Sequence, residues 1–227
     1  MHAIVLYEPP QSETLLLTNR AVEFTHRSAS KWIRLVPKRC TPSLGALTAC
    51  LWIKYNPILN ATKTTLLSYA TTTYTKAFVL LFEDEELVIR INSHSHLFGR
   101  LTLSNSTFSD NAWHYLCVSW ASSDGSWHFY VNGSLASQGT GYDVGEVLES
   151  DGAWVVGQDQ NSVGSGFDHR QAFKGFVSSV AIWDHVVNIT NCGLCCQGNL
   201  ITCPYFSSSE VELSDAVIVN DDGPNNC

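Results

Sequence analysis

Hydrophobic and polar residues alternate with a period of two along several short runs of the chain. The clearest runs cover 46–55, 77–91, 113–120 and 126–132, and each mixes aromatic with β-branched residues. This pattern is typical of strands that turn one face to a core. Outside a cysteine-rich segment at 188–198, which itself contains a glycine, no segment has the length or period of a helix. The pattern therefore predicts a chain built from strands.

Turn-forming residues separate these runs. Three pairs favour tight turns: Asp124-Gly125, Asn132-Gly133 and Asp151-Gly152. The acidic stretch 82–87 lies between two apolar runs, so we expect a hairpin whose carboxylates are solvated at its tip. Since the chain has no internal repeat and no low-complexity linker, we predict one all-β unit, a single sandwich.

Composition supports a single large β domain and excludes some functions. Of the 227 residues, 44% are hydrophobic and 11% aromatic, which is ample for one core. The net charge is −8 and the 13 lysines and arginines are scattered, so no basic surface for nucleic acid is expected. No apolar stretch approaches the ~20 residues of a membrane span.

Cysteine content and glycosylation sequons indicate an oxidising compartment. The chain has eight cysteines and one methionine, and an even number of cysteines at this density is typical of disulfide-bonded proteins. The alternative is a cytosolic protein with eight free thiols. Four sequons begin at Asn60, Asn105, Asn132 and Asn188. The first residues do not form a signal peptide, because Glu8, Pro9 and Pro10 interrupt the apolar run. We therefore expect an extracellular or cell-surface fragment of a longer precursor.

The C-terminal region after Thr190 is rich in cysteine. Cys192, Cys195, Cys196 and Cys203 follow one another closely, and the chain ends on Cys227. Close thiolates also suit zinc, but a second pair of ligands is missing and the chain has the features of a secreted protein. We predict disulfides here, in a stapled extension too short for a core of its own.

Three other motifs suggest chemistry but lack the residues that would complete it. His94 and His96 lie on one strand face, yet two imidazoles alone do not hold a metal. Ser165 lies between two glycines without the strand–turn–helix of a nucleophile elbow. The acidic residues 83–86 point to both faces of a hairpin, unlike the facing carboxylates of a glycosidase. We expect no catalytic site.

The segment 157–173 is the strongest candidate for a binding site. It offers oxygen ligands within a glycine-containing loop, from Asp159, Gln160, Asn161, Asp168 and Gln171. Gly164 and Gly166 allow the backbone to bend so that these oxygens converge, and oxygen ligation from a flexible loop is what Ca²⁺ prefers. A polar surface loop without a metal is the open alternative.

Several segments, in order, resemble the pentraxin domain. They are LTACLWIK, WHYLCVSW, DGSWHFYVNG, VVGQDQNSVGSGFDHRQAFKGFVSSVAIWDHVV and CCQGNLI. The resemblance runs over 22–227 and leaves 1–21 as an N-terminal extension. It implies a concanavalin- or laminin-G-like jelly roll, a sandwich of two antiparallel β-sheets, with a disulfide between its sheets and a calcium site on one face.

The resemblance also implies disulfide pairs. Cys50 and Cys117 match the core disulfide of the family, and Cys192 and Cys227 match a C-terminal bridge found in neuronal pentraxins. The remaining cysteines depart from the short pentraxins. We expect Cys40 to pair with one of the C-terminal cysteines.

The calcium ligands of the family are kept only in part. Asp159, the Gln160 carbonyl, Asp168 and Gln171 fall at ligand positions, and Asn161 falls where an aspartate is usual. The distant Asp-Asn pair of the family is replaced by Thr75 and Lys76. A lysine there repels Ca²⁺ or replaces it with an ammonium, so the resemblance implies one weakly bound ion at most.

These features imply an extracellular recognition or adhesion module that does not catalyse a reaction. The favoured host is the ectodomain of an adhesion-type G-protein-coupled receptor, with an extracellular protein or glycan as ligand. A secreted pentraxin that forms ring oligomers and binds ligands through calcium is the alternative. A glycan-cleaving enzyme on the same sandwich lacks an acid–base pair.

Overall fold

The computed structural model describes residues 20–55, 61–84, 86–93, 100–102, 107–108, 110–189, 197–203, 211–215 and 217–220. Within these ranges the chain forms fifteen strands and one short 3₁₀ helix. The strands are β1 (Arg20–Phe24), β2 (Ile33–Leu35), β3 (Ala46–Tyr55), β4 (Lys63–Ala70), β5 (Phe78–Glu83), β6 (Glu86–Ile91), β7 (Arg100–Thr102), β8 (His114–Ala121), β9 (Ser126–Val131), β10 (Ser134–Gly139), β11 (Ala153–Val156), β12 (Gly175–Trp183), β13 (Ile201–Cys203), β14 (Val211–Leu213) and β15 (Val217–Asn220), and the helix is η1 (His169–Gln171). No helix of this part of the chain is long and apolar enough to cross a membrane.

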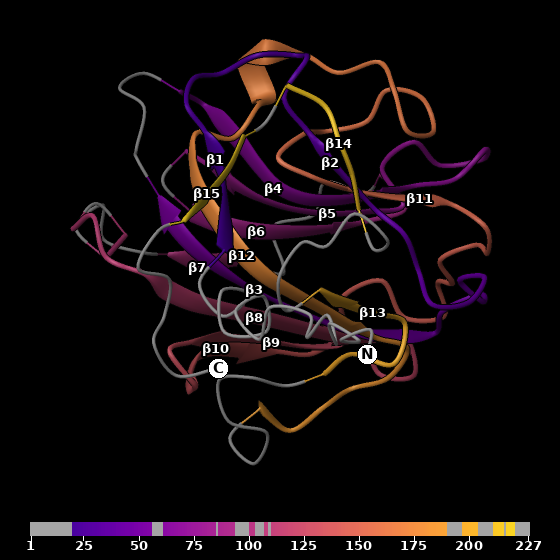
Figure 1. Cartoon of the computed structure of the whole chain (residues 1–227). Coiled ribbons are helices and arrows are strands. Elements are labelled where there is room, and N and C mark those ends of the chain that lie inside the picture. The colour runs from indigo at the N-terminus through magenta and orange to yellow at the C-terminus, as the bar shows by residue number, and fades with distance from the viewer. Residues whose placement is uncertain are drawn as a thin grey trace, which may run out of the picture.

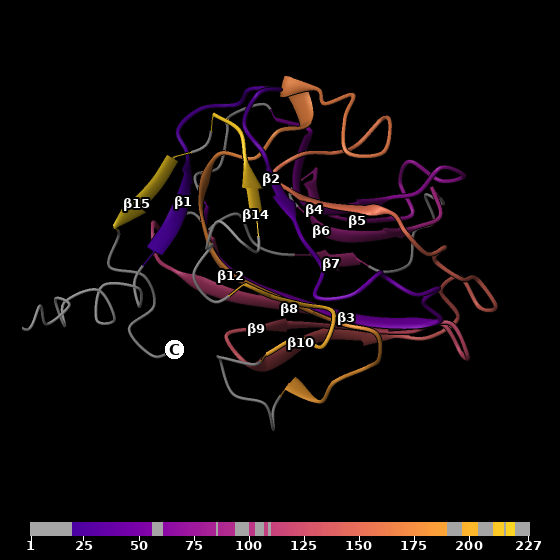
Figure 2. The ribbon, with the colours of Figure 1, turned by 45° about the vertical axis from the view of Figure 1, so that its right-hand side comes forward.

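The strands form two antiparallel sheets that pack as layers (Figures 1 and 2). Seven strands of the eight-stranded sheet follow the order β10-β9-β8-β3-β12-β1-β15. The eighth strand, β13, pairs with β12 on the same edge as β1 does. The seven-stranded sheet has the order β14-β2-β11-β4-β5-β6-β7. The predicted all-β, two-sheet sandwich is therefore confirmed, including the strand expected at 46–55.

Turn-forming residues have positive φ where the sequence predicts turns. Asn132 and Gly133 both have positive φ, at 51° and 80°, as the two-residue turn between β9 and β10 requires. Gly125 and Asp151 also adopt positive φ at the other two predicted turns.

One continuous hydrophobic core fills the space between the sheets. Tyr69 and Trp154 stack in it at 4.4 Å between ring centroids, and both are fully buried. Their polar atoms are partly satisfied, since the Tyr69 hydroxyl donates to the carbonyl of Glu149 at 2.9 Å. Burying such large rings supplies much of the hydrophobic stabilisation.

Tyr142 links the two layers through polar bonds inside this core. Its hydroxyl donates to the carbonyl of Ile89 in β6 at 3.0 Å. Its own carbonyl accepts from the Trp120 indole in β8 at 2.8 Å. Burial raises the pKa of the Tyr142 phenol far above its ordinary value, so it stays a neutral donor.

The outer face of the eight-stranded sheet carries a second apolar cluster, which contains the disulfide. Cys50 in β3 faces Cys117 in β8 directly, and their sulfur atoms are bonded. The predicted pair is confirmed, but its expected place between the two sheets is wrong. The bridge joins neighbouring strands of one sheet, because alternation puts Cys50 and Trp52 on the face opposite to Leu51.

The other cysteine predictions have different outcomes. Cys40 has a free thiol and is exposed, so its expected pairing with a C-terminal cysteine is wrong in this structure. Cys192, Cys195, Cys196 and Cys227 lie outside the described residues, as does the side chain of Cys203. The predicted Cys192–Cys227 bridge therefore stays a prediction.

The acidic hairpin between β5 and β6 is less solvated than its sequence suggests. Glu83 is buried, and both its oxygens accept from the Arg90 guanidinium, at 2.7 and 2.6 Å. Lys63 on β4 adds an ammonium 3.2 Å away. Burial alone would raise the pKa of Glu83, but Arg90 and Lys63 together hold it below its ordinary value. The sequence could not show this pairing, because both cations come from neighbouring strands.

We predict that replacing both Cys50 and Cys117 with alanine lowers the free energy of unfolding by about 3–5 kcal/mol, since the bridge closes a long loop. The two cysteines are separated by 67 positions in the sequence. Urea denaturation followed by tryptophan fluorescence measures the loss. Cys40→Ala is the matched control and should leave the midpoint unchanged. A free thiol at Cys50 in the folded protein would contradict the prediction.

We also predict that Glu83 makes stability depend on acidity. Its pKa in the folded state is below the ordinary value of 4.5, so its stabilisation is present above pH 4.5 and is lost as the pH falls through the folded-state pKa. Glu83→Gln should therefore lower the unfolding free energy by about 1–3 kcal/mol at neutral pH and flatten its decline in acid. Chemical denaturation at several pH values measures both effects. If the unfolding free energy of the variant depends on pH in the same way as that of the wild type, Glu83 does not have this role.

Candidate functional site

The candidate site is the loop that leaves β11 and returns into β12, with η1 near its end (Figure 1). Two backbone bonds close its base: Gly157 donates to Leu66 at 3.0 Å, and Phe173 donates to Gly157 at 2.9 Å. Gly157 has a φ of +85°, and a Cβ there would lie 2.4 Å from the ring of Phe24. The base of the loop is therefore fixed, and only glycine fits at 157.

The first part of the loop is buried, although it is polar. Gln160 is fully buried, and its amide nitrogen donates to Ser68 Oγ at 3.0 Å and to the Ala153 carbonyl at 2.9 Å. Its amide oxygen accepts from the backbone of Gly164 at 2.7 Å. Gln158, also fully buried, donates to the carbonyls of Ser28 and Lys31 at 2.6 and 2.7 Å. These two glutamines tie the loop to β4 and to the segment after β1.

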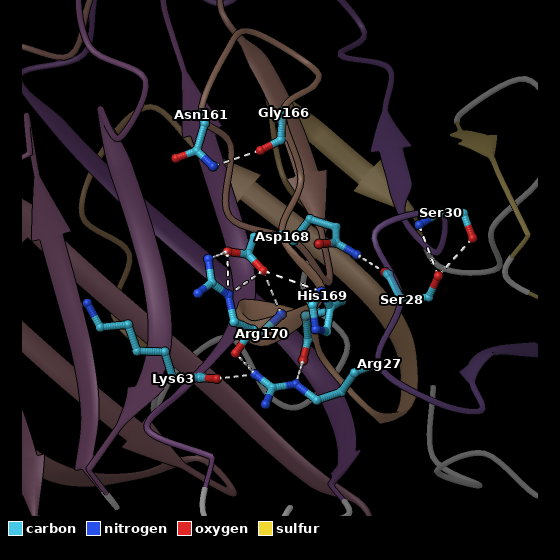
Figure 3. A network of polar contacts seen from close by, with 11 residues as sticks. Arg27, Ser28, Ser30, Lys63, Asn161, Gly166, Asp168, His169 and Arg170 are labelled. Atoms are coloured by element: carbon cyan, nitrogen blue, oxygen red, sulfur yellow. Dashed lines mark hydrogen bonds and ion pairs between the residues drawn. The ribbon is translucent and has the colours of Figure 1, made fainter.

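The second part is a small exposed hairpin. Ser162 and Ser165 exchange backbone bonds at 3.2 and 2.9 Å, and Asn161 Nδ2 donates to the Gly166 carbonyl at 2.7 Å (Figure 3). Gly164 and Gly166 have positive φ, which lets the chain reverse there. Val163, at the tip, is 37% exposed. The tip is thus an exposed surface held by bonds within the loop.

Asp168 caps η1 and binds its own neighbour. Its carboxylate accepts from the backbone nitrogen of Arg170 at 2.9 Å and from the Arg170 guanidinium at 2.6 Å (Figure 3). These bonds with Arg170 lower the pKa of Asp168 to about 2. The carboxylate is therefore ionised and already paired at neutral pH.

Arg27 holds η1 against the sheet. Its Nε donates to the carbonyl of Ala172 at 3.0 Å, and its Nη2 donates to the carbonyl of Lys63 at 2.5 Å and also to that of Arg170 (Figure 3). Burial lowers the pKa of the guanidinium, while Tyr55 and Asp168 act in the opposite direction. One side chain from the segment after β1 thus satisfies three carbonyls of the loop and of β4.

Asp159 forms the other ion pair of the loop. Its Oδ2 binds the ammonium of Lys76, which comes from the turn between β4 and β5. The Asp159 side chain is 8% exposed and that of Lys76 is 25% exposed. Asp159 Oδ1 is buried and has no hydrogen-bond partner among the described residues.

The predicted calcium ligands lie in one loop, but the structure commits most of them to other contacts. Asp159 pairs with Lys76, Gln160 binds Ser68 and Ala153, Asn161 binds Gly166, Asp168 binds Arg170, and Gln171 ends η1 half-buried. In the described part of the chain, no three His, Cys, Asp or Glu side chains gather as metal ligands. Among the side-chain oxygens of the two carboxylates, Asp159 Oδ1 alone has no donor. Calcium binding itself stays a prediction, and this donor set does not fit an ion without displacing Lys76.

Arg27 and Ser68 are the residues of this site that sequence reasoning missed. Ser68 Oγ donates to the Gln158 carbonyl at 2.7 Å and accepts from Gln160, so it joins both glutamines. Neither residue lies near the loop in sequence, and neither belongs to a motif. For Ser68, a serine within an otherwise apolar strand could have indicated a buried polar contact. Nothing in the sequence around Arg27 indicated its role.

The remaining predicted sites are Ser165, the histidine pair and the four glycosylation sequons. Ser165 belongs to the hairpin tip described above, where its backbone pairs with that of Ser162. His94 and His96 lie outside the described residues, as do the sequons at Asn60 and Asn105. Asn132 and Asn188 are described and exposed. Glycosylation at the four sequons stays a prediction.

A family model described as the Pentaxin family matches residues 20–219. The rat (Rattus norvegicus) sushi, von Willebrand factor type A, EGF and pentraxin domain-containing protein 1 is 29% identical over 195 residues, which are 81% of this chain and 5% of that protein. The human (Homo sapiens) neuronal pentraxin receptor is 30% identical over 171 residues, which are 72% of this chain and 33% of that protein. The chain thus spans a third or less of these relatives.

Solved structures share the fold. A native heptameric SAP-like pentraxin from Limulus polyphemus has a TM-score of 0.70 at 21% identity and covers 91% of this chain and 94% of its own. The full extracellular region of zebrafish Gpr126/Adgrg6 has a TM-score of 0.64 at 18% identity, covering 88% of this chain and 27% of its own. These likenesses show the two-sheet sandwich.

We predict that Arg27→Ala loosens the end of the loop, because three carbonyls lose their charged donor. The unfolding free energy should fall by about 1–3 kcal/mol, and amide exchange at 168–172 should accelerate. Hydrogen–deuterium exchange measured by mass spectrometry tests this. Arg39→Ala is the control, since Arg39 forms an exposed pair with Asp184 and such pairs contribute at most about 1 kcal/mol. Equal exchange in both variants would contradict the proposed anchoring.

Proposed function

Because the chain belongs to the pentraxin family, we propose that it is a recognition module in the ectodomain of a larger extracellular or cell-surface protein. Its relatives include a receptor and a very long multidomain protein, and the chain matches a small part of each. The fold likeness to the extracellular region of an adhesion-type receptor agrees with such a host. The ligand would be an extracellular protein or a glycan.

The observation that carries this proposal is the contrast within the loop 157–173. Its buried residues are hydrogen-bonded to β4, to β11 and to the segment after β1, whereas most residues of its tip at 161–166 and the side chains of His169 and Arg170 are exposed. An exposed loop on a rigid base loses little entropy when it binds a partner. Within the loop itself, the contacts of the described residues pair neither a nucleophile with a base nor two carboxylates with each other, so binding without catalysis is the function we propose.

A secreted pentraxin that assembles into rings is the second candidate. It is favoured by the likeness to a pentraxin that is itself heptameric, over nearly the whole of both chains. Sedimentation of the purified chain separates the two candidates, because a ring has several times the mass of the 25.1 kDa monomer. We favour the module within a larger protein, for which a monomer is expected.

We predict that the exposed tip of the loop carries the binding contact. The biotinylated chain, tetramerised on streptavidin, is screened against arrays of extracellular proteins and of glycans. Val163→Asp should weaken any interaction found by tenfold or more, which corresponds to about 1.4 kcal/mol or more. Leu135→Asp is the matched control, since Leu135 is 46% exposed on the edge strand β10 and Val163 is 37% exposed.

Two results would contradict the proposal. Equal loss in both variants would place the contact elsewhere or indicate general misfolding, which the melting temperature of each variant reveals. Hydrolysis of an arrayed glycan by the wild-type chain, but not by a Glu83→Gln variant, would replace binding with catalysis.

A further inference from the structure

Asp159 is a buried acid whose charge needs a cation. Its side chain is 8% exposed, and the residues on either side of it, Gln158 and Gln160, are fully buried. An ionised carboxylate removed from water is costly unless an opposite charge lies against it. In the described part of the chain, that charge comes from Lys76.

Lys76 is held in place to provide this cation. Its carbonyl accepts from the backbone of Ser93 at 2.8 Å, and the carbonyl of the next residue, Ala77, accepts from Asn92 at 2.8 Å. These bonds fix the turn before β5 against the end of β6. The lysine is only 25% exposed, so its aliphatic stem is largely covered while the ammonium reaches Asp159.

The negative charges of the loop are neutralised without an added ion. Segment 157–173 contains two carboxylates, Asp159 and Asp168, and one arginine, Arg170. Arg170 pairs with Asp168, Lys76 pairs with Asp159, and the Arg27 guanidinium lies against η1, so the loop has no excess of negative charge. Ca²⁺ is attracted by excess negative charge and takes 6–8 oxygen ligands, which this arrangement does not offer.

We propose that the Lys76 ammonium is the resident cation of this loop. It neutralises Asp159 and holds the loop against the turn between β4 and β5, where the family resemblance implies a calcium ion. The order of the loop, and any binding through its tip, is then independent of Ca²⁺. The inference does not rest on the proposed ligand, because it is tested on the loop alone.

The test compares thermal melting in EDTA and in 5 mM CaCl₂ for the wild-type chain and three variants. The wild-type melting temperature should be the same in both buffers. Lys76→Met keeps the stem and removes the charge, so it should melt roughly 5–10 °C lower, as expected for a broken, partly buried ion pair. Lys76→Arg restores a cation and should recover most of this loss. Lys38→Met, at an exposed lysine, should have no effect.

Hydrogen–deuterium exchange locates the effect. Lys76→Met should speed amide exchange in 157–171 and leave β8 and β9 unchanged. Two outcomes overturn the proposal: a rise of the wild-type melting temperature by roughly 3 °C or more in CaCl₂ that Asp159→Ala abolishes, or wild-type exchange of the loop in Lys76→Met. The first would show that calcium holds the loop, and the second that the ammonium does not.

Discussion

The structure depends on burying both faces of its central strand. β3 packs Leu47, Leu51 and Ile53 into the core between the sheets, while Cys50 and Trp52 lie in a second apolar cluster on the opposite side. A strand covered on both faces cannot slip in register without exposing one set of side chains. β8 and β12 are fixed on either side of it, and the loop 157–173 leads directly into β12. The position of the loop 157–173 therefore depends on the packing of β3.

Most of the strands could be predicted from the alternation of hydrophobic and polar residues, because this pattern is visible within a short stretch of sequence. Residues 46–55 were predicted as a strand and form β3 with the same bounds, and the Asn132-Gly133 turn has the backbone its sequence demands. The disulfide partners followed from the family resemblance, but their location did not. Which face Cys50 occupies depends on the register of β3 against both sheets, and this is a property of the whole fold.

The site was predictable in part, for a related reason. The loop, its glycines and its oxygen-bearing residues are contiguous in sequence, and Lys76 was recognised because it stands at a position where another residue type was expected. Arg27 and Ser68 were missed, since they reach the loop from strands and turns that are distant along the chain. Long-range polar partners leave no periodic signal, which is also why the burial of Glu83 was not foreseen.

The pairing of β1 with β15 has a mechanical consequence. Arg20 lies opposite Asn220, so the chain enters and leaves the sandwich at one corner, on two adjacent antiparallel strands (Figure 2). A pulling force applied through these two positions acts across the ladder and separates its hydrogen bonds one after another, rather than shearing them all together. Within a longer protein under tension, we expect β15 to detach first, because it is an edge strand paired with β1. The disulfide joins β3 and β8, which are not the strands that take this load first.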